Sequence, residues 1–153
     1  AALMDWTGDS YKSINGYLFG GRNPSKDVIH QVECIDEAIS DHITRERFTV
    51  DRQMRLSTFH VNDMESLFDL NTGRTFEHIG YMATSIKEGG IDVDGEDRIA
   101  TRILVPPGSA GVYVEPITQH PGEYEILLPR GRALRFEGLG ASDGRPIVYL
   151  RLL

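Results

Sequence analysis

The order of periodic patterns along the chain constrains the fold more than any other feature of the sequence. Apolar residues recur at helical spacing in residues 10–19 and again from Ser25 to Ile43, whereas short runs of β-branched and aromatic residues prevail from Phe48 onward. Helices that precede strands, instead of alternating with them, predict an α+β domain and argue against a βαβ architecture. Neither a GxGxxG turn after a first strand nor a GxxxxGKS/T loop occurs. If this domain binds a nucleotide, it does so without either of these motifs.

The second helical pattern begins where Ser25 can cap it, and a short helix is expected after Asn62, ending at Gly73. An extended stretch is expected between the second helical pattern and this short helix. Glycine and proline divide the remainder into short segments. We predict strands in residues 48–61, 74–85, 98–105, 111–116, 123–128, 132–137 and 146–152.

Composition excludes several classes of protein. The chain has 153 residues, of which 40% are hydrophobic, as expected of one globular domain. Its net charge of −7 argues against bulk attraction to nucleic acid or to an anionic membrane surface. A single cysteine, Cys34, excludes an intrachain disulfide, and the spacing of the five histidines predicts no metal site. Because position 1 is not Met, we expect the chain to be part of a longer protein or to follow a tag.

An acidic pair stands out in the segment PGEYEILLPRG, residues 121–131. Glu123 and Glu125 are two positions apart in a run typical of a strand, so both are predicted to lie on the face that also carries Leu127. Two carboxylates this close need cations or hydrogen-bond donors near them. An acidic pair at a strand edge is more often solvated surface, so a functional interpretation depends on the rest of the chain.

Three motifs follow one another along the chain. They are Arg55 in the first extended stretch, GYMATS at residues 80–85 and EYEILLPRG at residues 123–131. In this order they resemble the mono-ADP-ribosyltransferase toxin and effector family. The segment SYKSINGYLFGG, residues 10–21, is similar to the Y..IN..LR helix of that family. The resemblance covers nearly all of the chain. It implies one catalytic domain, residues 1–153, with N-terminal helices followed by two packed, mainly antiparallel sheets around an NAD cleft.

The resemblance also implies a reaction, the transfer of ADP-ribose from NAD to an arginine of a target protein. Splitting the N-glycosidic bond of NAD builds positive charge on the ribose, which Glu125 would stabilise. Glu123 would orient the acceptor guanidinium and take its proton. Arg55, the third catalytic residue, would hold phosphate or ribose oxygens of NAD with its planar set of donors.

Further residues receive roles from the same resemblance. The backbone of Leu56 would bind the nicotinamide amide, and the loop of residues 86–98 would cover NAD, with Arg98 or Arg102 near its phosphates. Other residues expected to contact NAD are Asn15, Tyr81, Ala83, Thr84 and Ser85. Residues expected in the turn that presents the target protein are Gln119, His120 and Tyr124.

One position departs from the family pattern. Ala83 stands where the family's Ser-Thr-Ser motif has its first serine, the hydroxyl that orients the catalytic glutamate. Either Thr84 replaces that hydroxyl or turnover is slow, so an NAD glycohydrolase and a binding module without turnover stay open as alternatives. A transferase acting on nucleic acid is disfavoured by Glu123 and by the acidic charge. The family further implies a secreted or delivered effector that acts in a target-cell cytoplasm, with an immunity or inhibitor protein as a second partner.

Overall fold

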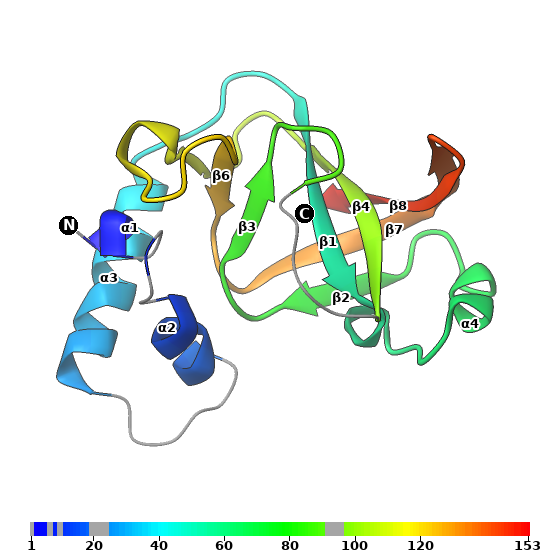
Figure 1. Cartoon of the computed structure of the whole chain (residues 1–153), viewed down its shortest axis with the longest axis horizontal. Helices are drawn as coiled ribbons and strands as arrows, with labels where there is room; N and C mark the ends of the chain where they lie inside the picture. Colours follow the sequence, from blue (N-terminus) through cyan, green and yellow to red (C-terminus); the bar gives the residue numbers. More distant parts are fainter. Residues whose placement is uncertain (1, 6–7, 9–10, 19–24, 91–96) are drawn as a thin grey trace.

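Three helices precede the sheet in the computed structural model, which describes residues 2–5, 8, 11–18, 25–90 and 97–153 (Figure 1). They are α1 (Ala2–Asp5), α2 (Tyr11–Leu18) and α3 (Lys26–Ser40). The side chain of Ser25 accepts a hydrogen bond from the backbone N–H of Val28 (3.2 Å) and caps α3, as predicted. The predicted helix end at Gly20 and Gly21 lies outside the described residues.

Eight strands of the described residues form one hydrogen-bonded sheet. In chain order they are β1 (Phe48–Arg55), β2 (Thr75–His78), β3 (Met82–Ser85), β4 (Arg98–Val105), β5 (Val112–Tyr113), β6 (Glu125–Leu128), β7 (Arg132–Ser142) and β8 (Arg145–Leu152). Their order in space is β2-β7-β8-β4-β1-β3-β6-β5, and every neighbouring pair is antiparallel except β4 and β8.

The sheet is nearly divided between β1 and β3, which pair only at Asp51 and Ser85. We call strands β2, β7, β8, β4 and β1 the large half and strands β3, β6 and β5 the small half. The helices pack beside the small half, where Figure 1 shows them grouped near β3 and β6. Two packed, mainly antiparallel sheets after N-terminal helices were predicted, and this arrangement confirms that prediction.

Alternation along the strands of the small half produces two separate cores. Leu127 faces the helices, in a cluster with Ile14, Val32, Ile35, Ile39, Tyr81, Val112 and Val114. Its neighbour Leu128 faces the large half and packs in the cluster that contains Met82, Val50, Met54 and Ile103. Because successive side chains leave a strand on opposite faces, the small half is held between the helices and the large half.

Several elements differ from the prediction because turns interrupt the expected runs. Residues 74–85 form β2 and β3 instead of one strand, and the extended stretch after Arg55 becomes a short 3₁₀ helix, η2 (Leu56–Phe59). The helix α4 (Met64–Phe68) is capped by Asp63, not Asn62, through the N–H of Ser66 at 2.7 Å.

The C-terminal hairpin is longer than predicted. Strand β7 continues past Gly138, where a bulge shifts its register with β8, and the turn at Asp143 and Gly144 has positive φ at both residues (53° and 76°). The predicted strand 111–116 is cut short by a second 3₁₀ helix, η3 (Glu115–Ile117). No helix in the described part of the chain is long and apolar enough to cross a membrane.

Candidate functional site

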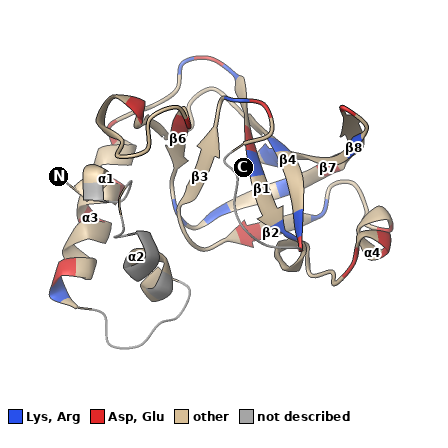
Figure 2. Ribbon diagram, in the orientation of Figure 1, with Lys and Arg blue, Asp and Glu red and all other residues tan. Residues whose placement is uncertain are grey.

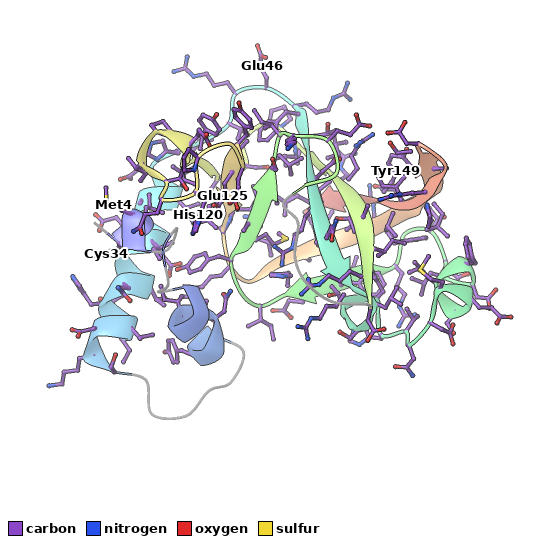
Figure 3. All side chains as sticks on the ribbon, viewed as in Figure 1. Met4, Cys34, Glu46, His120, Glu125 and Tyr149 are labelled. Carbon is purple, nitrogen blue, oxygen red and sulfur yellow. The ribbon has the colours of Figure 1, made fainter. Side chains whose placement is uncertain are left out.

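The contact between the two halves of the sheet places three polar residues in one row. Asp51 on β1 pairs with Ser85 on β3, and Ser85 pairs with Glu125 on β6. Glu125, marked in Figure 3, is only 4% exposed. A buried carboxylate is costly unless a cation or hydrogen-bond donors face it, so this position is a candidate site.

The cation that faces Glu125 is Arg52, next to Asp51 on β1. Its Nη1 donates a hydrogen bond to the carbonyl oxygen of Ala83 on β3 at 2.8 Å. Burial, and then the like charge of Arg98, lower the pKa of Arg52 to about 10, while the attraction of Glu125 opposes that shift. The Arg52 guanidinium therefore stays charged at neutral pH and attracts the carboxylate of Glu125.

Arg52 thus takes the place beside Glu125 that we predicted for Arg55. Arg55 ends β1, is exposed and pairs with Arg98. Arg55 lies four positions along the strand from Asp51, which is about 13 Å at the usual rise per residue. A signal was present in the sequence, because Arg52 alternates with Val50 and Met54 and so lies on the buried face of the strand. A contact of Arg55 with NAD stays a prediction.

Two predicted NAD-binding residues have other partners. The N–H of Leu56 donates to the carbonyl oxygen of Asp97 (2.9 Å), so it is not available to a nicotinamide amide in this structure, and its side chain is buried in the core. The hydroxyl of Tyr81 donates to Asp36 Oδ1 (2.5 Å) on α3 and lies 3.0 Å from the Val32 carbonyl oxygen. Burial, followed by the hydrogen bond to Asp36, raises the pKa of Tyr81 well above its usual value. Tyr81 therefore fastens α3 to the small half.

The hydroxyls of β3 are also committed. Thr84 is fully buried and donates from Oγ1 to the carbonyl oxygen of Ile126 at 2.7 Å. Adjacent strand residues point to opposite faces, so this geometry favours slow turnover over replacement of the missing hydroxyl by Thr84, the two alternatives that the sequence left open. Ser85 lies on the same face as Ala83, but its Oγ donates to the carbonyl oxygen of Glu123 and accepts from the N–H of Lys87 (2.9 Å).

The turn before β6 departs from the predicted strand. Strand β6 begins at Glu125, and Tyr124 has a left-handed backbone with φ of 50°. Glu123 therefore lies half-buried in the turn that precedes β6. This corrects the prediction that Glu123 and Glu125 share one face of a strand. Gln119 is exposed in the same region, and its Nε2 donates to the carbonyl oxygen of Met4 on α1 at 3.1 Å. Its contact with a target protein stays a prediction.

Two residues of this turn keep their predicted place. His120 and Tyr124 are exposed, with 44% of Tyr124 accessible, and Figure 3 shows His120 in the loop ahead of β6. Their contact with a target protein stays a prediction.

Unpartnered polar atoms suggest where a ligand binds. Among the described residues, two buried side-chain atoms have no hydrogen-bond partner, Asn15 Oδ1 on α2 and Arg52 Nε. Buried polar atoms are rarely left without a partner, and the donors and acceptors of a dinucleotide fit one acceptor and one cationic donor. Asn15 was among the predicted NAD-binding residues, and its contact with NAD stays a prediction.

The two arginines of β4 have different neighbours. Figure 2 shows arginines along β4 and β7 of the large half. Arg102 is held by Asp51 in a bidentate pair (2.9 and 3.0 Å), whereas Arg98 lies close enough to Arg52 to lower the pKa of Arg52. A contact of either arginine with the phosphates stays a prediction. Residues 91–96 of the predicted covering loop lie outside the described residues.

No group of three or more His, Cys, Asp or Glu side chains within the described ranges is arranged to hold a metal ion. Sequence reasoning assigned no role to His78, a buried histidine near Arg52 whose Nδ1 lies 2.8 Å from the carbonyl oxygen of Gly80. A buried ionisable side chain beside a candidate site is the signal that could have found it, but only its tertiary position reveals the burial.

The burial of His78 predicts a pH dependence of stability. Burial, and then the charge of Arg52, lower the pKa of His78 from 6.5 to about 4. Between these two pH values the unfolded chain binds a proton that the folded protein does not, so stability is present above the higher value and is lost as pH falls towards the lower one. The loss amounts to at most about 3 kcal/mol. Denaturation by urea at pH 4–7 should show a shallower pH dependence for His78→Gln than for the wild type, and equal slopes would contradict the assignment.

Known proteins resemble this chain in sequence and in structure. The model of the ADP-ribosyltransferase exoenzyme family matches residues 1–146. Mono-ADP-ribosyltransferase C3 of Clostridium botulinum C phage is 39% identical over 75 residues, which cover 48% of this chain and 30% of that protein. The matched segment thus spans less than a third of that relative.

Solved structures share the fold. Plx2a, an ADP-ribosyltransferase toxin from Paenibacillus larvae, superposes with a TM-score of 0.81 at 21% identity, over 99% of this chain and 84% of that one. C3stau2 from S. aureus, solved with NAD, gives 0.81 at 22% identity over the same shares. BECa of a C. perfringens binary enterotoxin, solved with NADH, gives 0.80 at 21% identity, over 99% and 42%.

The family match covers most of the fold described above. The exoenzyme model spans nearly every residue from the N-terminal helices to β8, and the structure puts a buried glutamate and an arginine together where the two halves of the sheet meet. The chain therefore belongs to the ADP-ribosyltransferase exoenzyme family.

Proposed function

We propose that this chain is a single catalytic domain that transfers ADP-ribose from NAD to an arginine side chain of a target protein. The observation that supports the proposal most is the buried carboxylate of Glu125, which faces the charged guanidinium of Arg52. A carboxylate that is shielded from water stabilises nearby positive charge far more strongly than a carboxylate in solvent.

In the proposed reaction the bond between nicotinamide and ribose C1′ breaks, and nicotinamide leaves with the electron pair. Glu125 accepts a hydrogen bond from a ribose hydroxyl and stabilises the oxocarbenium charge that develops. A nitrogen of the acceptor guanidinium then forms the new bond to C1′. The proton that this nitrogen releases goes to Glu123.

Glu123 is the residue that favours arginine as the acceptor. Guanidinium groups stay protonated at neutral pH, so a nucleophilic arginine needs a carboxylate that orients it and accepts a proton as the bond forms. Glu123 is half-buried in the turn that leads directly into Glu125, and its carbonyl oxygen is held by Ser85. The proposed acceptor carboxylate is therefore two residues before the carboxylate assigned to the ribose.

The NAD contacts follow from the unpartnered atoms. We assign Arg52 Nε and Asn15 Oδ1 to polar groups of NAD, with Arg98 near the pyrophosphate and Arg55 as an outer contact. Charge-assisted bonds from arginine suit phosphate oxygens.

The setting of the reaction is part of the same proposal. The words exoenzyme and toxin in the names of the family and its relatives support a secreted or delivered protein that acts in a target-cell cytoplasm. The partners would be a target protein with a reactive arginine and an inhibitor that protects the producing cell.

The test follows adenylate-labelled NAD with the wild type and with Glu123→Gln. The wild type is expected to label protein arginines and agmatine, a small guanidinium acceptor. Glu123→Gln is expected to lower transfer by about a hundredfold, because the acceptor proton has no carboxylate to receive it, while NAD hydrolysis continues.

Other outcomes separate the alternatives. If the wild type releases free ADP-ribose and labels no acceptor, the chain is an NAD glycohydrolase. If NAD is not consumed at all, the domain is a module without turnover, which the alanine at position 83 favours.

A further inference from the structure

One carboxylate outside the predicted site holds the turn before β6. Glu115, the first residue of η3, accepts two backbone hydrogen bonds through separate oxygens. Its Oε1 accepts from the N–H of Gly122 at 2.7 Å, and its Oε2 accepts from the N–H of Tyr124 at 2.9 Å. Bonds to an ionised acceptor are shorter and stronger than neutral ones.

These two amides flank Glu123 on both sides. Gly122 has φ of 93° and Tyr124 has φ of 50°, so the backbone is left-handed before and after Glu123. Glycine adopts this conformation readily, but tyrosine does so only when its surroundings enforce it. The carboxylate of Glu115 is well placed to enforce it, because it binds the N–H of the strained residue itself.

Glu125 is held by different means. It pairs with Ser85 in the ladder of β3 and β6 and is attracted by Arg52. Loss of the Glu115 carboxylate would therefore release the backbone around Glu123 and leave Glu125 in its place.

We propose that Glu115 is a positioning residue that sets Glu123 for the acceptor without taking part in the splitting of NAD. This inference rests on the proposed function, in which Glu123 orients the guanidinium. It predicts that transfer to an acceptor and hydrolysis of NAD respond differently to one substitution.

The experiment uses Glu115→Gln, which keeps the shape of the side chain but offers one acceptor oxygen and turns an NH₂ group towards the second N–H. Amide hydrogen exchange at Gly122 and Tyr124 is expected to become about tenfold faster. The KM for agmatine should rise, and transfer should fall, by about tenfold. The rate of NAD hydrolysis should stay within about twofold, because Glu125 is held by β3 and Arg52 and not by Glu115.

A matched control is Glu137→Gln, because Glu137 is a carboxylate on β7 that is paired with Arg135 instead of with backbone amides. It should change neither exchange at the turn nor either activity. Unchanged exchange at Gly122 and Tyr124 in Glu115→Gln, or an equal fall of transfer and hydrolysis, would overturn the proposal.

Failure of the proposed function gives a different result. In that case the wild type consumes no NAD or transfers nothing to agmatine, and the exchange measurement alone then decides whether Glu115 holds the turn. Faster exchange at both amides supports this structural role, and unchanged exchange rejects it.

Discussion

Glu125→Gln is expected to lower NAD turnover by roughly a thousandfold. The amide keeps the size of the side chain but removes the negative charge that would stabilise the ribose in the transition state. Hydrolysis and transfer should both fall, because both need the bond between nicotinamide and ribose to break. The measurement is the release of nicotinamide at saturating NAD, with circular dichroism to show that the fold survives.

The same variant tests the pairing of Glu125 with Arg52. A buried guanidinium that loses its nearest anion is less stable, so the melting temperature of Glu125→Gln should fall. Glu137→Gln serves again as the control, since its exposed pair with Arg135 contributes little. Turnover at the wild-type rate in folded Glu125→Gln would remove the basis of the proposed mechanism.

Arg52→Ala is expected to have the second-largest effect. It leaves Glu125 buried without a facing cation and removes the bond from Nη1 to the Ala83 carbonyl oxygen, which joins β1 to β3. Losing this hydrogen bond together with the attraction between Arg52 and Glu125 is expected to cost roughly 3 kcal/mol of stability. Turnover should fall by about a hundredfold, because neither NAD nor Glu125 is then held.

Two variants separate charge from geometry in that result. Arg52→Lys keeps the charge but loses the planar set of donors, so it should recover much of the stability and only part of the turnover. Arg55→Ala is the matched control, an exposed arginine on the same strand, and should change stability by less than about 0.5 kcal/mol. If Arg55→Ala abolishes turnover and Arg52→Ala does not, the arginine that we first predicted is the catalytic one.

Local features of the fold could be predicted because they depend on neighbouring residues. The stripe of apolar residues and the cap at Ser25 defined α3, and the alternation within residues 98–105 defined β4. Both elements obey the period of their own backbone. The motif order likewise located the strand that carries Glu125 within two residues of its observed start.

What the sequence could not predict shares a cause, which is that polar groups near the site bind partners far along the chain. The hydroxyl of Tyr81 bonds to Asp36, and Thr84 bonds to Ile126. Neither pairing is visible in a local pattern, because each joins elements brought together only by packing. The strand expected to include Glu123 failed for a related reason, since Glu115 holds the backbone of Tyr124 in a turn.

The sequence by itself determined the α+β class, the family resemblance and the identity of the glutamate at position 125, because these depend on periodicity, residue order and a short motif. Only the tertiary structure decided which arginine faces that glutamate. Arg52 and Arg55 are three positions apart on β1 and therefore lie on opposite faces, and the single pairing of β1 with β3 at Asp51 brings Arg52 into the junction between the two halves. Burial beside a carboxylate, which no local pattern encodes, gives that arginine its role.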